Sequence, residues 1–332
     1  MINFIINRLG QMVVMLVIIS IVSFVIIELP PGDYLSSYIS MLQREGAVVS
    51  HAEIENLRKY FGLDQPMVVR YFSWIWNIVS AGNFGWSFGW DRPVSSVIGD
   101  RIGMTMMLSL VTLVFVWAVA VPIAIYSATH QYSAIDYLTT FLGYIGLAIP
   151  NFLIALVLVW VSLVYFGVPV TGLVGEEYMT AAWSFDKVLS MLSRIWIPIV
   201  VIGTSSTAVL IRVLRGSVLD ELNKQYVVTA RAKGVSEGKL LLKYPVRVAI
   251  NPLISTIGWT LPALISSESI TGIVLNLPTT GPMLYNALIT QDMYLAASFI
   301  LILSALTVFG TFLSDILLAI VDPRIRYTGG AR

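Results

Sequence analysis

Six apolar segments, each long enough to cross a lipid bilayer, constrain the fold of this chain more than any other feature. A membrane-spanning helix needs about 20 mostly apolar residues. The segments that meet this length are 9–29, 103–128, 138–166, 195–216, 249–273 and 295–321. Hydrophobic residues make up 57% of the sequence and charged residues only 12%, which excludes a soluble protein of this size. The sequence therefore predicts an all-α integral membrane protein with six transmembrane helices.

Two of these segments carry features that affect how they are interpreted. Segment 138–166 holds Pro150 and Asn151 near its middle, and a proline within a helix removes a hydrogen bond, so we expect a kink or a tilt there. The first segment follows Arg8 and has the appearance of a signal peptide. Because no small-residue cleavage site follows it, we expect it to be retained as a span.

Lysine and arginine are distributed unevenly among the polar segments. The segment from Arg212 to Arg247 holds eight basic residues against three acidic ones, whereas the segment between the last two spans holds no Lys or Arg. Because basic residues concentrate in cytoplasmic loops, we expect both termini and the segment around Gly234 to be cytoplasmic. We expect Arg212 and Arg215, at the end of the fourth span, to anchor it at the lipid headgroups.

The longest polar stretch, residues 30–103, lies between the first two spans and is therefore expected to be extracellular. Its charges are nearly balanced, and residues 55–102 are rich in aromatic side chains. Two interpretations stay open: an interfacial aromatic belt with a small packed core, and a docking surface for an external binding protein. We expect an N-terminal region, 1–102, and a core domain, 103–325, which holds five spans and a cytoplasmic loop, 217–247.

The segment from Tyr226 to Pro252 is too polar to cross a bilayer although it lies between two apolar helices. Residues 227–233 contain no helix breaker, Gly234 follows them, and Ser236 with Glu237 is typical of an N-cap and a first helical turn. The sequence thus predicts a helix, a glycine turn and a second short helix. A membrane protein that holds such a segment on one face offers it to a soluble partner.

This segment resembles the cytoplasmic "EAA" loop in the permease subunits of ATP-binding-cassette importers. Val228, Thr229 and Ala230 stand at the Glu-Ala-Ala positions of that loop, and Gly234 stands at its glycine. The run Thr-Ala-Arg-Ala-Lys-Gly is similar to the dipeptide/oligopeptide branch, from which Tyr244-Pro245 departs. The resemblance implies a fold like that of type I importer permeases. It also implies that the ATPase-coupling residues are Val228, Thr229, Ala230, Ala232, Lys233 and Gly234.

Further motifs carry the same resemblance along nearly the whole chain. Residues 61–66 read FGLDQP, similar to the "GLDxP" of peptide permeases, and residues 83–87 and 92–94 are similar to their "GDLGxS" and "RPV" signatures. Nearer the end of the chain, the matching residues are Pro278, Gly281, Ala287, Asp292, Asp315, Asp322, Pro323 and Arg324. The departures at Gly272, Thr279 and Gln291 place the chain in a divergent subgroup. Both peptides and oligosaccharides are therefore kept as candidate solutes.

The sequence offers no residues for covalent chemistry. It has no cysteine, its two histidines, His51 and His130, are far apart, and no G-x-x-x-x-G-K-[ST] motif for nucleotide phosphates is present. We therefore expect no enzyme activity, no cofactor and no metal site, and nothing indicates nucleic-acid binding. The resemblance implies partners that supply the missing functions: a second homologous permease, two ATP-binding subunits and an external solute-binding protein. Membrane lipid is a further expected partner. It also implies transport by alternating access.

Three polar residues within the apolar segments are candidates for the solute pathway: Glu268, Ser267 and Asn151. Buried carboxylates in membranes cost several kcal/mol, so Glu268 either lines the pathway or is solvated at the membrane interface. Asp315, in the last span, is expected to pair with a neighbouring helix. Two other classes of protein are weighed. An ion-coupled secondary transporter receives little support, because the sequence offers it only Glu268 and Asp315. A membrane enzyme would need clustered catalytic residues, which the sequence does not suggest.

Overall fold

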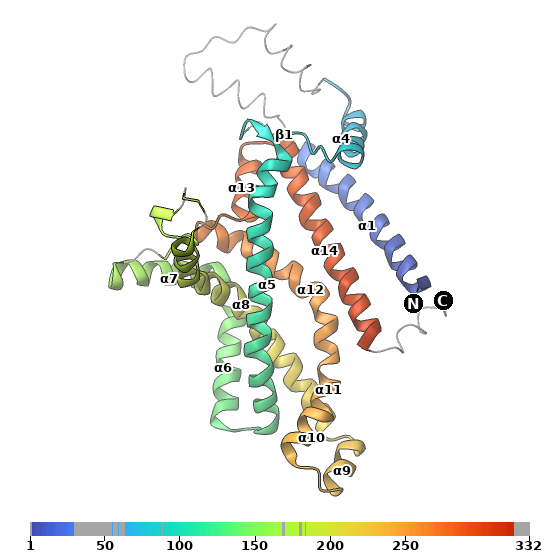
Figure 1. Cartoon of the computed structure of the whole chain (residues 1–332), viewed down its shortest axis with the longest axis vertical. Helices are drawn as coiled ribbons and strands as arrows, with labels where there is room; N and C mark the ends of the chain where they lie inside the picture. The colour runs from blue at the N-terminus through green and yellow to red at the C-terminus, as the bar shows by residue number, and fades with distance from the viewer. Residues whose placement is uncertain are drawn as a thin grey trace. The chain divides into compact units, whose positions relative to one another are not determined.

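The computed structural model describes residues 2–29, 55, 59, 64–87, 89–167, 170–178, 181–182 and 184–321 (Figure 1). The motif matches at 61–63 and 322–324 lie outside the described residues. The elements, in chain order, are α1 (Ile2–Glu28), α4 (Met67–Ala81), β1 (Trp86–Ser87), β2 (Arg92–Pro93), α5 (Val94–Thr129), α6 (Ala134–Ala148), α7 (Asn151–Phe166), η1 (Glu176–Tyr178), α8 (Phe185–Leu222), α9 (Gln225–Ala232), α10 (Glu237–Lys243), α11 (Pro245–Ala249), α12 (Asn251–Val274), α13 (Thr280–Ile289) and α14 (Met293–Val321).

Among the described residues, four helices are long and apolar enough to cross a membrane. They are Ile5–Ile26, Val94–Thr129, Phe185–Leu222 and Met293–Leu317. The number of candidate spans rises to five if the bent pair of α6 and α7 forms one span. Ala263–Val274, within α12, is a shorter apolar helix. The predicted all-helical membrane fold is therefore confirmed with four to five candidate spans, and six is not reached by this criterion.

The third predicted span is broken at Pro150, where α6 and α7 meet at 98°. Ile149 is extended, with φ −93° and ψ 122°, and Pro150 precedes the first residue of α7. The Pro150 carbonyl accepts hydrogen bonds from the amides of Leu153 and Ile154, so α7 starts a new ladder instead of continuing that of α6. The expectation of one kinked or tilted helix over 138–166 is therefore corrected to two helices with a sharp bend, because proline cannot extend the ladder.

The chain forms two compact units, each built from segments that are not consecutive in the sequence. The first comprises Met1–Leu9, Met106–Pro278 and Phe309–Arg332, and the second comprises Gly10–Thr105 and Thr279–Val308. In the first unit, α8 packs against α6, α7, α11 and α12. Its core joins the end of α5, through Ala124 and Ala128, to Leu214 and Val218 of α8 and to Leu253 of α12. These contacts place the ends of α5 and α8 beside the start of α12.

The second unit is built around an apolar cluster that includes Phe24 of α1, Trp74 of α4 and Phe299 of α14. A two-residue hairpin, in which Trp86 pairs with Pro93 and Ser87 with Arg92, precedes α5. Asp292 holds this hairpin to the start of α14. Its Oδ2 accepts hydrogen bonds from the Ser87 hydroxyl at 2.6 Å and from the Gly89 amide at 3.1 Å, and its Oδ1 accepts one from the Leu295 amide at 3.3 Å.

Candidate functional site

The predicted helix, glycine turn and second helix are confirmed at α9 and α10. Gly234 has φ +77°, a left-handed conformation that L side chains rarely adopt. The Val235 amide donates to the Ala230 carbonyl at 3.3 Å, and the Gly234 amide donates to Arg231 at 3.0 Å. This pair of bonds is the Schellman arrangement that ends a helix. Ser236 is the N-cap residue of α10, as predicted, although its side chain accepts no capping hydrogen bond.

The two short helices pack on each other through a small apolar cluster. Its buried members are Val227, Ala230 and Leu240, with Val235 and Tyr244 partly buried around them. Ala230 therefore faces inward, and its small side chain lets α9 approach α10. The assignment of Ala230 to ATPase coupling stays a prediction. We call residues 225–243, with this internal cluster, the coupling segment.

The outer surface of the coupling segment combines apolar and charged side chains. Five of the six predicted ATPase-coupling residues are exposed: Val228, Thr229, Ala232, Lys233 and Gly234. Val228 is 47% exposed and Leu242 is 69% exposed. Arg231 and Glu237 tie the two helices together at the surface, with Nε 2.6 Å from Oε1 and Nη2 3.1 Å from Oε2. The hydrogen bond from Arg231 lowers the pKa of the Glu237 carboxyl, and that from Glu237 raises the pKa of Arg231.

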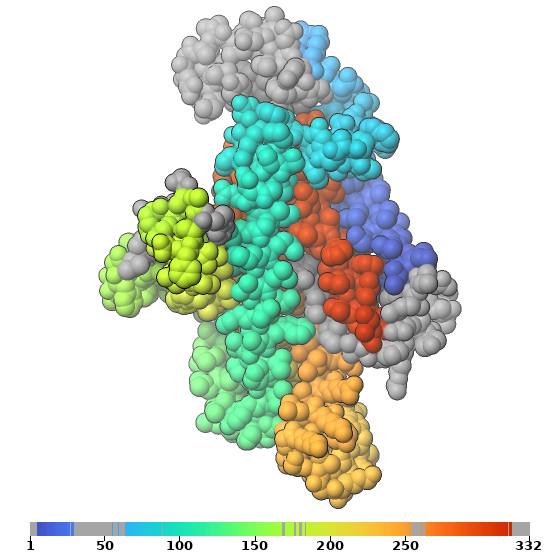
Figure 2. Space-filling view, in the orientation of Figure 1, coloured from blue at the N-terminus to red at the C-terminus, as the bar shows by residue number. Residues whose placement is uncertain are grey.

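The coupling segment projects from one end of the first unit, where α8 ends and α11 begins (Figures 1 and 2). Two residues separate Leu222, the last of α8, from Gln225, the first of α9. At the other end, α10 packs against α11, which starts at Pro245. The segment is thus joined to α8 at one end and, through the short helix α11, to α12 at the other.

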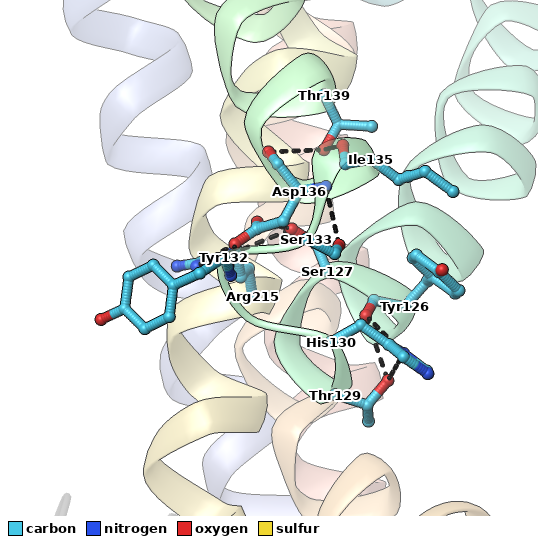
Figure 3. A network of polar contacts seen from close by, with 10 residues as sticks. All are labelled: Tyr126, Ser127, Thr129, His130, Tyr132, Ser133, Ile135, Asp136, Thr139 and Arg215. Carbon is cyan, nitrogen blue, oxygen red and sulfur yellow. Dashed lines mark hydrogen bonds and ion pairs between the residues drawn. The ribbon is translucent and has the colours of Figure 1, made fainter.

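A polar network beside this end of α8 was not predicted from the sequence (Figure 3). Arg215 of α8 donates to both carboxylate oxygens of Asp136 in the first turn of α6, at 3.0 and 2.9 Å. Asp136 also accepts from the Tyr132 amide at 2.9 Å and from the Ser127 hydroxyl. The Ser133 side chain caps α6 by accepting from the Asp136 amide at 3.2 Å. The network fixes the turn between α5 and α6 to α8.

Arg215 therefore pairs with a carboxylate of the protein, whereas the sequence predicted that it anchors the helix at the lipid headgroups. Its partner is 79 residues away, and the side chain of Asp136 is only 5% exposed. One sequence feature pointed to this pair: Asp136 follows a short polar turn between two apolar segments, and this turn is expected on the same membrane face as Arg215. Asp315 pairs as predicted, since its Oδ2 lies 3.2 Å from Nη1 of Arg8.

The three candidate pathway residues lie close together in the first unit. The Asn151 amide nitrogen donates to Ser267 of α12 at 2.6 Å and to the Ile202 carbonyl of α8 at 3.3 Å. Its oxygen accepts from the Ser205 hydroxyl of α8 at 2.7 Å. Glu268 follows Ser267 and is 1% exposed, so it is not a solvated interfacial carboxylate in this structure. Asn151 thus joins the start of α7 to α8 and α12, and the pathway role of all three residues stays a prediction.

Comparison with known proteins identifies the family. Residues 120–327 match "Binding-protein-dependent transport system inner membrane component", and residues 1–111 match "Binding-prot-dependent transport system membrane comp, N-term". The chain is 34% identical over 326 residues to the oligopeptide transport system permease protein AppB of Bacillus subtilis (strain 168), covering 98% of this chain and 99% of the relative.

Two further relatives match over similar lengths. The oligopeptide transport system permease protein OppB of Haemophilus influenzae (strain ATCC 51907 / DSM 11121 / KW20 / Rd) is 28% identical, covering 98% of this chain and all of the relative. The dipeptide transport system permease protein DppB of Escherichia coli (strain K12) is 26% identical, covering 98% of this chain and 99% of the relative.

This chain belongs to the family of inner membrane components of binding-protein-dependent transport systems. The family resemblance noted in the sequence is confirmed. The chain is a multi-pass membrane protein and the non-catalytic, permease component of its transport system. The three relatives described above are named for peptide transport, so these comparisons give the oligosaccharide interpretation no support.

Proposed function

We propose that this chain is one permease subunit of an ATP-driven peptide importer and forms half of the solute pathway. The coupling segment carries the proposal, because it projects from the first unit with exposed apolar side chains and is joined to α8 directly and to α12 through the short helix α11. The peptide transport named for the relatives AppB, OppB and DppB supports peptides as the solute. For an ion-coupled secondary transporter the sequence offers little beyond Glu268 and Asp315.

The complete assembly proposed here contains a second homologous permease, two ATP-binding subunits and an external solute-binding protein. Membership of a binding-protein-dependent family supports these partners. In this proposal α12 is the sixth span, and both termini and the coupling segment are cytoplasmic, which the eight basic residues between Arg212 and Arg247 support. Residues 1–102 then form the N-terminal region, and 103–325 the core domain, with its cytoplasmic loop at 217–247.

In the proposed mechanism, closure of the ATP-binding subunits displaces the coupling segment, and α8 passes this displacement into the membrane. The helix α8 is continuous from Phe185 to Leu222. It carries Ser205 and Ile202, both hydrogen-bonded to Asn151. Movement of α8 therefore bears directly on the polar residues proposed to line the pathway, as alternating access requires.

The docking role is tested by adding bulk to the outer surface without disturbing the internal cluster. Ala232 is exposed and lies outside the cluster, so Ala232→Trp should leave the segment folded but block a partner groove. Gln131→Trp, in the turn between α5 and α6, adds a similar side chain at an exposed position outside the coupling segment. Each variant is co-expressed with the other transporter subunits and purified by a tag on this chain.

We expect Ala232→Trp to lower recovery of the ATP-binding subunits by at least about tenfold, equivalent to about 1.4 kcal/mol of binding. Gln131→Trp should keep the wild-type recovery, and both variants should insert into the membrane normally. Full recovery and full ATP-dependent peptide uptake with Ala232→Trp would show that the coupling segment is not the docking site.

A further inference from the structure

The surface of α4 is divided into three faces along the helix. At about 100° per residue, its inward face carries Tyr71, Trp74 and Ile78, which belong to the apolar cluster of the second unit. The rest of the helix surface consists of an apolar arc and a polar arc. An arc of roughly 100° is apolar and between 46% and 76% exposed, and it holds Val68, Val69, Phe72, Trp76 and Val79. The neighbouring exposed arc is polar and holds Ser73, Asn77 and Ser80.

The first half of α4 lies beside the last turns of the candidate span in α1 (Figure 1). Tyr71 is 2.8 Å from the Ser20 hydroxyl, and the rings of Tyr71 and Trp74 are each 5.5 Å from that of Phe24. Ser20 lies about 12 Å along the helix axis before Glu28, the last residue of α1. The contacts therefore place α4 alongside the end of a membrane-spanning helix and not beyond it.

The charges at this junction are paired and largely buried. Arg70 is the single charged residue of α4, and its Nη2 lies 2.7 Å from Oε1 of Glu28, with both side chains 10% exposed. An unpaired charge at the edge of the hydrocarbon costs several kcal/mol, and pairing removes much of this penalty. The apolar arc itself carries no charge, and the end of α1 is also apolar and exposed, at Val22, Val25 and Ile26.

We propose that α4 is an interfacial helix that lies in the outer leaflet of the membrane, with its apolar arc against lipid acyl chains and its polar arc toward the headgroups and water. Helices of this type bury an apolar face at the boundary of headgroups and acyl chains. Trp76, at the centre of the arc, is a side chain enriched at such boundaries. Lipid is chosen as the occupant because the contacts with Ser20 and Phe24 hold α4 alongside a candidate membrane-spanning helix.

This position in the membrane also sets the height of the hairpin that follows. The Trp74 indole donates to the Phe84 carbonyl at 3.1 Å, and Gly82 ends α4 in a left-handed conformation, with its amide bonded to Ile78 at 2.9 Å. The hairpin carries Trp86 and Arg92. An α4 held in the outer leaflet would therefore keep these side chains at a fixed level above the bilayer.

The absence of cysteine from the native sequence makes the test direct. Single cysteines replace Phe72, Trp76 or Val79 in the apolar arc, and Ser73, Asn77 or Ser80 in the polar arc as matched controls. Each full-length chain is labelled with a nitroxide and reconstituted in vesicles of phosphatidylcholine and phosphatidylglycerol. Its collision rates with oxygen, which concentrates in lipid, and with a water-soluble nickel chelate are then measured by electron paramagnetic resonance.

We expect the ratio of oxygen to nickel collisions to be at least about fivefold higher for the apolar arc than for the polar arc, given the approximately 5–10 Å insertion of such helices. Equal nickel accessibility on both arcs would place α4 in water and overturn the proposal. Low collision rates with both reagents on the apolar arc would show that protein covers it, which also overturns the proposal. Variants that change the elution of the purified chain are replaced by Val68→Cys in the same arc.

Discussion

The guanidinium of Arg215 faces the carboxylate of Asp136 edge to edge, with Nε 3.0 Å from Oδ1 and Nη2 2.9 Å from Oδ2. Two-point pairs of this kind are stronger than single contacts and fix the orientation of both side chains. The pair joins α8 to the first turn of α6 next to the coupling segment. It therefore holds the base of the proposed docking element in place.

Removing one partner of this pair should destabilise the chain. Asp136 is 5% exposed and Arg215 is 28% exposed, so Arg215→Ala should cost up to about 3 kcal/mol because it leaves a buried carboxylate without its main partner. Arg215→Lys should give an intermediate result, since an ammonium cannot make both contacts. Thermal unfolding in detergent measures the effect, with Arg212→Ala, at an exposed position of α8, as the control. Equal transition temperatures for all four chains would contradict the prediction.

Close packing of α6 on α8 should depend on Gly146 and not on Gly143. A Cβ atom at Gly146 would lie 2.9 Å from Cγ2 of Thr204, whereas one at Gly143 would lie 3.9 Å from the Cβ of Ala208. We expect Gly146→Ala to cost about 1–3 kcal/mol by overpacking and Gly143→Ala to be neutral or stabilising.

The steric cause of the Gly146 effect can be checked by compensation. Thr204→Ser removes the clashing methyl group but keeps the hydroxyl that donates to the Val200 carbonyl at 2.6 Å. The Gly146→Ala, Thr204→Ser chain should therefore recover most of the lost thermal stability. If it does not, the clash with Thr204 is not the reason for the loss.

The phenol of Tyr226 should titrate at unusually high pH. Burial, followed by the hydrogen bond and the charge of Glu221, raises the pKa of Tyr226 from 10.0 to about 12. Because the pKa is raised in the folded chain, the associated stability is fully present below about pH 10 and is lost as the pH rises toward 12.

Phenolate absorbance after a rapid pH jump tests this value. Tyr226 is isolated by subtracting the signal of a Tyr226→Phe chain. Glu221→Gln should bring the pKa back toward 10.0, because the acceptor charge is removed. A wild-type phenol that titrates near 10 would show that the contact with Glu221 is not formed in the purified protein.

The pathway role of Glu268 can be separated from a packing role. Glu268→Gln keeps the size of a side chain that is 1% exposed, so the transporter should still assemble. We expect peptide uptake to fall by at least about tenfold, equivalent to about 1.4 kcal/mol. Ser269→Ala, which removes only a hydroxyl bonded within its own helix, is the control. Unchanged uptake by the Glu268→Gln complex would remove Glu268 from the pathway.

The sequence predicted those features that depend on neighbouring residues. Runs of apolar residues predicted the four long candidate spans, and Gly234 predicted the turn between α9 and α10, because few other residues adopt its conformation. The paired state of Asp315 was also predicted, since a carboxylate at that depth needs a partner. Local sequence sets the helices and the turn, whereas the partner of Asp315 is Arg8, far away in the sequence, which was not named from the sequence.

Other features depend on contacts between distant parts of the chain and were missed. Proline at position 150 indicates a break, but the 98° bend also involves Asn151, which bonds residues 51 to 116 positions away in α8 and α12. Likewise, Arg215 was assigned to lipid because its partner Asp136 is 79 positions away, and a shared membrane face does not by itself pair two residues. The inward orientation of Ala230 depends on Leu240, across the turn.

The bend at Pro150 leaves two helices of 15 and 16 residues, each about 23 Å long, where the hydrocarbon core is about 30 Å thick. Neither α6 nor α7 can cross such a bilayer alone, whereas α5 and α8, with 36 and 38 residues, exceed its thickness. The chain therefore combines helices that are shorter than the hydrocarbon core with helices that are longer than it. Lipids of different acyl length should favour different tilts of these helices, which makes bilayer thickness a physical variable in the working of this transporter.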